Sequence, residues 1–216
     1  MSLTLYYAPG ACSFVPHCAL ELAGAAFEPQ MVNFREGQQR TPEYLALNPR
    51  GQVPVLMVDG QPLTQIVAIA GYIAAAFPQA GLLSPEPWLR ARAIEALAYM
   101  NNTIHPCFTR FFRSANFVGD AESQAQLKAA AALKYRDHMG ELDEMARKAV
   151  GPFLFGATPS FADFYMLTLF RWGGFAGIDG DAFAALAPHV DRVAALPAVA
   201  RVIAREGITV RTYKKP

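Results

Sequence analysis

Residues 3–17 read LTLYYAPGACSFVPH, and this stretch decides the fold of the N-terminal part of the chain. Residues 3–7 predict a short β-strand, and residues 8–11 predict a turn. Residues 12–17 predict the start of a helix that runs to about Gly24. The chain therefore opens with a strand, a tight turn and a helix.

Cys12 and Ser13 stand at the N-terminus of this predicted helix. Free backbone N–H groups and the helix dipole there favour a thiolate or a bound anion. A cysteine so placed can have its pKa lowered from about 8.5 to between about 3.5 and 7.5. Thiol chemistry is therefore the first hypothesis, and the alternative is that Cys12 is a buried, inert packing residue.

The following residues alternate between strand and helix patterns. They predict a strand over residues 27–32 and a capped helical turn over residues 41–45. A β-hairpin follows over residues 53–58 and 61–64, with its turn at Asp59-Gly60, and then a helix over residues 66–77. The order βαβ-ββα predicts a small mixed sheet with helices packed on it.

The composition changes after residue 78. Prolines and a glycine without hydrophobic periodicity predict a linker over residues 79–88, between an α/β domain over residues 1–78 and an all-α domain over residues 89–216. Apolar stripes predict helices over residues 89–116, 121–150, 160–175 and 197–206.

Two further local signals lie in this helical part. Ser160 followed by Asp163 predicts a capping box at a helix N-terminus, with a structural role. The polar tail over residues 209–216 is expected to fray or to lie over the surface.

Composition excludes several classes of function. With 19 basic and 18 acidic residues the net charge is +1, which gives no sign of a nucleic-acid or membrane-surface partner. No run of eighteen apolar residues and no secretory signal is seen, so we expect no membrane span and a cytoplasmic protein. Three cysteines at unrelated spacings fit reduced thiols, and four isolated histidines predict no metal site.

Three features of the N-terminal part converge on one kind of ligand. Pro54 suggests a special backbone geometry, and a cis Val53–Pro54 bond would present the Val53 N–H and C=O to an extended peptide. Thr64 and Gln65 precede a helix whose N–H groups form a second anion site. Together with Cys12, these groups would surround a small acidic peptide that carries a thiol.

This pattern resembles the cytosolic glutathione transferases, most closely the bacterial beta class, over nearly the whole chain. The resemblance rests on YYAPGACS (6–13), NPRGQVPVL (48–56), LTQ (63–65), NTIH (102–105) and SFAD (160–163). It implies a thioredoxin-like N-terminal domain, an all-helical C-terminal domain, glutathione as co-substrate and a homodimer.

The resemblance also implies roles for individual residues. Cys12 would meet the glutathione sulfur with Tyr6 nearby, and Ser13 would help to favour the thiolate. His105 would contact glutathione or the second substrate, and Arg35 would pair with the glycine carboxylate. Gln52, Val53 and Pro54 would form the turn that binds the peptide, with the Val53 backbone paired to the cysteinyl residue.

The sequence departs from the family pattern at Gln65-Ile66. The family usually has Glu or Gln followed by Ser here, to hold the ammonium and carboxylate of the γ-glutamyl group. Gln65 offers only a neutral acceptor, and Ile66 lacks the hydroxyl. We therefore expect weaker glutathione binding than in a member with Glu-Ser.

The expected reaction is attack of the glutathione thiolate on a small hydrophobic electrophile, with a role in detoxification. Phe108 and Phe112, beside His105, are expected to line the electrophile site. Two alternatives remain open: a glutathione-dependent thiol-disulfide reductase or peroxidase that uses Cys12, and a non-catalytic binding protein of the same fold.

Overall fold

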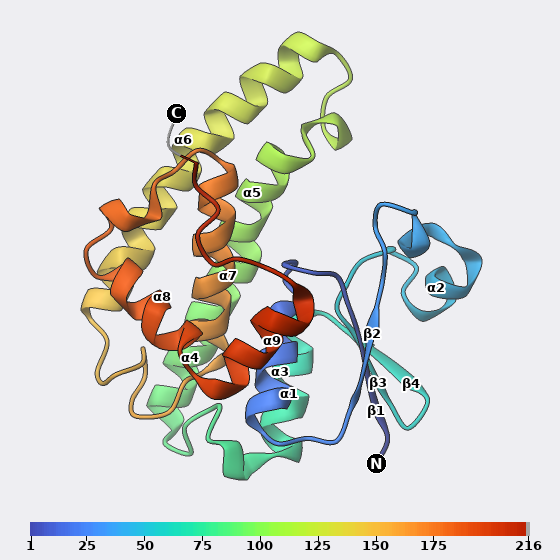
Figure 1. Ribbon diagram of the computed structural model, residues 1–216, viewed down its shortest axis with the longest axis vertical. Coiled ribbons are helices and arrows are strands. Elements are labelled where there is room, and N and C mark those ends of the chain that lie inside the picture. The colour runs from blue at the N-terminus through green and yellow to red at the C-terminus, as the bar shows by residue number, and fades with distance from the viewer. Residues whose placement is uncertain (215–216) are drawn as a thin grey trace.

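The computed structural model describes residues 1–214, and it begins with a four-stranded sheet (Figure 1). The strands are β1 (Leu3–Tyr7), β2 (Glu28–Met31), β3 (Val55–Val58) and β4 (Gln61–Thr64), in the order β2-β1-β3-β4. β1 pairs parallel with β2, while β1–β3 and β3–β4 are antiparallel. The predicted βαβ-ββα order and mixed sheet are confirmed.

Alternation along β1 divides the N-terminal core into two layers. Leu3, Leu5 and Tyr7 are buried against α1 (Phe14–Leu22) and α3 (Ile66–Ala76), within the main core of the molecule. Tyr6 points to the opposite face and packs in a smaller cluster with Tyr44 of α2 (Pro42–Leu47). Because strand side chains alternate between faces, one strand serves both layers. Figure 1 shows α1 and α3 between the sheet and the C-terminal helices, with α2 on the far side.

The rest of the chain is helical. Its helices are α4 (Pro87–Tyr99), α5 (His105–Phe112), α6 (Ala121–Arg147), α7 (Phe161–Phe175), α8 (Leu186–Ala194) and α9 (Pro197–Glu206). α7 is buried on all sides from Phe161 to Phe170, as expected for a central helix. Among residues 1–214, no helix combines the length and apolarity that crossing a membrane requires.

The helix predicted over residues 89–116 is not continuous. A π-helical turn over Met100–Ile104 separates α4 from α5, and α5 ends at Phe112. Pro106 has no N–H to donate to the preceding turn, so the regular hydrogen-bond ladder cannot run through this point. α4 also begins earlier than expected, because the Glu86 carboxylate accepts the N–H groups of Trp88 and Leu89.

The predicted capping box is confirmed. The Asp163 carboxylate accepts the Ser160 N–H at 2.7 Å, and it also contacts the Leu154 N–H and His189 Nε2. The tail lies over the surface, since Arg171 Nε donates to Thr209 O at 2.8 Å. Residues 215–216 of that prediction lie outside the described residues.

Candidate active site

A cleft of about 330 Å³ lies between the sheet part and the helical part. It is lined by Cys12, Asn48, Gln52, Val53, Pro54, Gln65, Ile66, Asn101, His105, Pro106, Thr109, Arg110 and Phe117. Most of the residues singled out in the sequence therefore meet in one cavity. Tyr6, Ser13, Arg35, Phe108 and Phe112 are absent from its lining.

Cys12 reaches the cleft from the turn between β1 and α1. Its side chain is 8% exposed, and its Sγ donates to Val53 O at 3.5 Å. Burial raises the pKa of Cys12 to about 12, although backbone hydrogen bonds and the Arg113 charge act in the opposite direction. The predicted lowering of this pKa is thus wrong, because loss of solvent outweighs the helix end. Cys12 carries its proton at neutral pH and serves as a hydrogen-bond donor.

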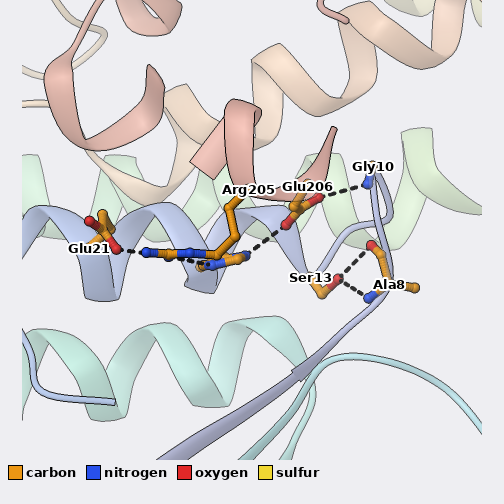
Figure 2. A network of polar contacts seen from close by, with 7 residues as sticks. Ala8, Gly10, Ser13, Glu21, Arg205 and Glu206 are labelled. Atoms are coloured by element: carbon orange, nitrogen blue, oxygen red, sulfur yellow. Dashed lines mark hydrogen bonds and ion pairs between the residues drawn. The ribbon is translucent and has the colours of Figure 1, made fainter. Parts of the chain in front are cut away.

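Ser13 does not face the cleft. Its hydroxyl is fully buried, accepts the Ala8 N–H at 3.1 Å and donates to Ala8 O at 3.3 Å (Figure 2). Both bonds close the turn that carries Cys12. The expected contact of Ser13 with a thiolate is therefore corrected to a structural role.

A buried network attaches the same turn to the C-terminal helix, as Figure 2 shows. The Gly10 N–H donates to Glu206 Oε2 at 2.7 Å, and Glu206 Oε1 lies 2.7 Å from His17 Nδ1. Both side chains of this pair are fully buried, and Arg205 contacts His17 Nε2 at 3.1 Å. Trp172 Nε1 also donates to Gly10 O at 2.9 Å. Sequence analysis missed this network, since no local pattern relates residues that lie so far apart along the chain.

The turn at Val53-Pro54 has the cis geometry that the sequence suggested. The Val53–Pro54 bond is cis, and Val53 lines the cleft beside Cys12. Within residues 1–214, no acceptor receives the Val53 N–H. The preceding residues are held by hydrogen bonds from the Tyr44 hydroxyl and the Asn48 amide to Gln52 O.

Gln65 and Ile66 form the end of the cleft at the start of α3. Gln65 has a φ of 72°, in the left-handed region that non-glycine residues seldom adopt. The first bond of the helix runs from the Ile69 N–H to Gln65 O, so the N–H groups before Ile69 have no acceptor within the helix. The Ile66 side chain is only 3% exposed and belongs to the main core. A hydrocarbon side chain thus stands at the edge of this N–H cluster.

His105 enters the cleft directly after the π-helical turn. Its Nδ1 lies 2.6 Å from the Tyr165 hydroxyl, and its ring meets Trp172 edge-on at 4.7 Å. Burial, together with the Arg113 charge, lowers the pKa of His105 to about 4. The imidazole is neutral at physiological pH and can exchange hydrogen bonds with a ligand.

The expected aromatic wall is wrong. Phe108 is 6% exposed and stacks on Trp172 at 4.7 Å in the core, while Phe112 is 62% exposed outside the cleft. Asn101, His105 and Thr109 line the cleft instead, and they are spaced four residues apart, as on one face of a helix. Phe108 lies on another face of α5 from these residues.

Two more expected residues lie elsewhere. Arg35 is exposed on the segment after β2 and does not line the cleft, so its expected pairing with glutathione has no support here. Tyr6 packs edge-on against Tyr44 at 5.9 Å on the far side of the sheet. Among residues 1–214, no cluster of histidine, cysteine and acidic side chains could hold a metal ion.

Comparison with known proteins gives one consistent result. The family model "Glutathione S-transferase, N-terminal domain" matches residues 1–75. Glutathione S-transferase GST-4.5 of Xanthomonas campestris pv. campestris is 33% identical, over 95% of this chain and 100% of its own length. A maleylacetoacetate isomerase of Pseudomonas aeruginosa is 31% identical, over 92% of this chain and 91% of its own length.

The fold agrees with these sequence relatives. A solved glutathione transferase homologue from Sulfitobacter, with bound glutathione, has a TM-score of 0.89 at 28% identity, over 96% of this chain and 99% of that one. Since a glutathione S-transferase that is 33% identical spans 95% of this chain and all of its own length, the chain belongs to the glutathione S-transferase family and is a glutathione transferase.

Proposed function

We propose that the cleft binds glutathione and directs its thiolate onto a small electrophile held against the helical part. The observation that carries this proposal is the meeting of Cys12, Val53 and Ile66 with His105 in one cavity of about 330 Å³. A peptide site on the sheet and a second surface on α5 then share one space, as a two-substrate reaction needs.

Glutathione would lie along the sheet side of this cavity. The unbonded Val53 N–H supports pairing with the cysteinyl residue, and the free N–H groups at the start of α3 support binding of the γ-glutamyl carboxylate. Gln65 would then accept a hydrogen bond from the ammonium group. Ile66 supplies no hydroxyl, so we expect this end of the peptide to be held loosely.

Cys12 would act as a donor to the glutathione sulfur. A thiol with a pKa of about 12 keeps its proton at pH 7, and its S–H can favour the neighbouring thiolate. The thiolate then forms a C–S bond to the electrophile, the leaving group departs with its electron pair, and the glutathione proton passes to water. Pro106 and Phe117 offer the hydrophobic contacts for such an electrophile.

The same burial argues against disulfide exchange as the main reaction. Because burial raises the pKa of Cys12 to about 12, the thiol form prevails at pH 7. The thiolate is the nucleophile in thiol-disulfide exchange. A reductase that depends on Cys12 would therefore be slow.

A second candidate is a glutathione-dependent isomerase, favoured by the relative named maleylacetoacetate isomerase. Reversible addition of the thiolate to a carbon–carbon double bond would permit rotation before the thiolate leaves again. This reaction would use the same cleft and the same groups. Turnover of a cis-alkene without net consumption of glutathione would distinguish it from conjugation.

We further propose that the chain acts in the cytoplasm as a homodimer in the detoxification of electrophiles. Trp88 and Ile94 of α4 are 70% and 38% exposed, and a second copy could cover them. The cysteines Cys12, Cys18 and Cys107 are all free, which suits a reducing compartment. Light scattering of the purified protein would test the dimer.

The catalytic proposal is tested with 1-chloro-2,4-dinitrobenzene and glutathione, beside hydroxyethyl disulfide and glutathione. We expect conjugation to exceed disulfide reduction, and Cys12→Ala to slow conjugation about tenfold, as for loss of one hydrogen bond to a charged group. The matched control is Cys107→Ala, since Cys107 is buried on another face of α5 and should leave the rate unchanged. Failure of the wild type to bind immobilised glutathione, together with no activity on either substrate, would leave only the non-catalytic alternative.

A further inference from the structure

Arg110 brings a positive charge into the cleft, and no carboxylate of residues 1–214 forms an ion pair with it. It lies in the last turn of α5, is exposed and lines the cavity, with its guanidinium 5.8 Å from the Phe117 ring centre. In the described part of the chain, arginines in ion pairs are Arg92, Arg147, Arg201, Arg205 and Arg211. Arg110 is not among them.

Arg113 adds a second cation one turn further along the chain. It also has no ion-pair partner within residues 1–214, and its guanidinium lies 5.8 Å from the ring centre of Phe34, which belongs to the sheet part. Its charge opposes the rise of the Cys12 pKa that burial causes, and it adds to the fall of the His105 pKa that burial causes. Arg113 therefore acts electrostatically on the groups at the centre of the cleft.

The rest of the lining does not balance these charges. The cleft is walled by neutral side chains, and no aspartate or glutamate is among the residues that line it. A cation near a helix C-terminus also stabilises the helix dipole, which accounts for an arginine in this turn. The dipole does not account for a guanidinium on the face that meets the substrate. A cation in a cleft without acids instead favours an anionic ligand.

Resting on the conjugation reaction above, we propose that the second substrate is an electrophile that carries a carboxylate, which Arg110 binds. Guanidinium and carboxylate match as bidentate hydrogen-bonding partners. Pro106 and Phe117 would then hold the apolar part of the substrate, while Arg110 orients its charged end. This replaces the apolar acceptor expected from Phe108 and Phe112.

The test uses a matched pair of activated aryl chlorides, 4-chloro-3-nitrobenzoate and 4-chloro-3-nitrobenzamide. In both, the glutathione sulfur bonds to the ring carbon, the carbon–chlorine bond breaks and chloride leaves. The variants are Arg110→Met and, as a control, Arg136→Met, which removes an exposed charge on α6 outside the cleft. Comparing each variant with the wild type cancels the intrinsic reactivity of the two probes.

We expect Arg110→Met to lower kcat/KM for the benzoate about ten- to hundredfold, as for loss of a charge-assisted hydrogen bond, and to change the benzamide rate less than twofold. Arg136→Met should change neither. An equal loss for both probes, with a raised KM for glutathione, would overturn the proposal and assign Arg110 to the glycine carboxylate of glutathione. Unchanged rates for both probes would also overturn it.

If the wild type turns over neither probe, the conjugation reaction is refuted. A binding measurement then still tests the anion site at Arg110. The preformed conjugates of glutathione with the two ring systems are titrated into wild type and Arg110→Met by calorimetry. Tighter binding of the carboxylate conjugate that is lost in Arg110→Met supports the anion site. Equal affinities in both proteins would overturn it.

Discussion

Replacing Ile66 with serine should strengthen glutathione binding and weaken the fold at the same time. Ile66 is the first residue of α3 and stands where the N–H groups of the helix end are free. A serine there places a hydroxyl donor beside the site proposed for the γ-glutamyl carboxylate. The Ile66 side chain is also 3% exposed in the main core, so its removal affects packing.

The two effects have separate magnitudes. A hydrogen bond to a charged group contributes about 1.5–3 kcal/mol, so the dissociation constant for glutathione should fall about ten- to hundredfold. Loss of a buried isoleucine side chain costs about 2–5 kcal/mol. Because Ile66 borders the cleft, water can enter part of the space left behind, and we expect the lower end of that range, about 2 kcal/mol.

Calorimetric titration with glutathione and urea unfolding of the free protein measure the two effects independently. Ile66→Ala is the matched control, since it removes the same hydrocarbon without adding a hydroxyl. It should lose similar stability and gain no such affinity. Equal dissociation constants for wild type and Ile66→Ser would refute the reasoning, and an equal gain in Ile66→Ala would show that bulk, not the missing hydroxyl, limits binding.

Three further predictions concern the turn that carries Cys12 and the groups beside it. The rate at which iodoacetamide alkylates Cys12, monitored by mass spectrometry, should rise about tenfold per pH unit beyond pH 9, because the pKa of the thiol is about 12. A rate that levels off near pH 8 would contradict the burial argument. Stability should fall as the pH drops from about 6.5 to about 4, because His105 binds a proton in the unfolded chain but stays neutral in the folded one, where its pKa is about 4. In thermal unfolding, His105→Gln should lose less stability than the wild type over the same pH range. Glu206→Gln should lower the free energy of unfolding by about 3–5 kcal/mol in urea, because it breaks the fully buried pair with His17 and leaves that histidine without its carboxylate. A loss below about 1 kcal/mol would mean that the pair contributes little.

Much of the fold follows from local features of the sequence. The strand, turn and helix over residues 3–17, the hairpin around Asp59-Gly60 and the capping box at Ser160 all appear as expected. Each depends on side-chain periodicity or on residues a few positions apart, which the sequence displays directly. Local signals also placed Cys12 and Val53 around one ligand, whereas the position of His105 beside them followed from the family resemblance, since no spacing relates residues so distant.

The tertiary structure alone decided which site side chains are protonated and in which direction each of them points. Position at a helix end favours a thiolate at Cys12, but the packing around it removes water and reverses the sign of the pKa shift. Ser13 turns its hydroxyl to Ala8, and Glu206 reaches Gly10 from the far end of the chain. Sequence determines which chemical groups are available, whereas burial and long-range contacts determine their charge and their partners. Packing between distant helices likewise places Phe108 in the core and leaves Arg110 along the cleft, because the partners of each face of α5 come from other parts of the chain.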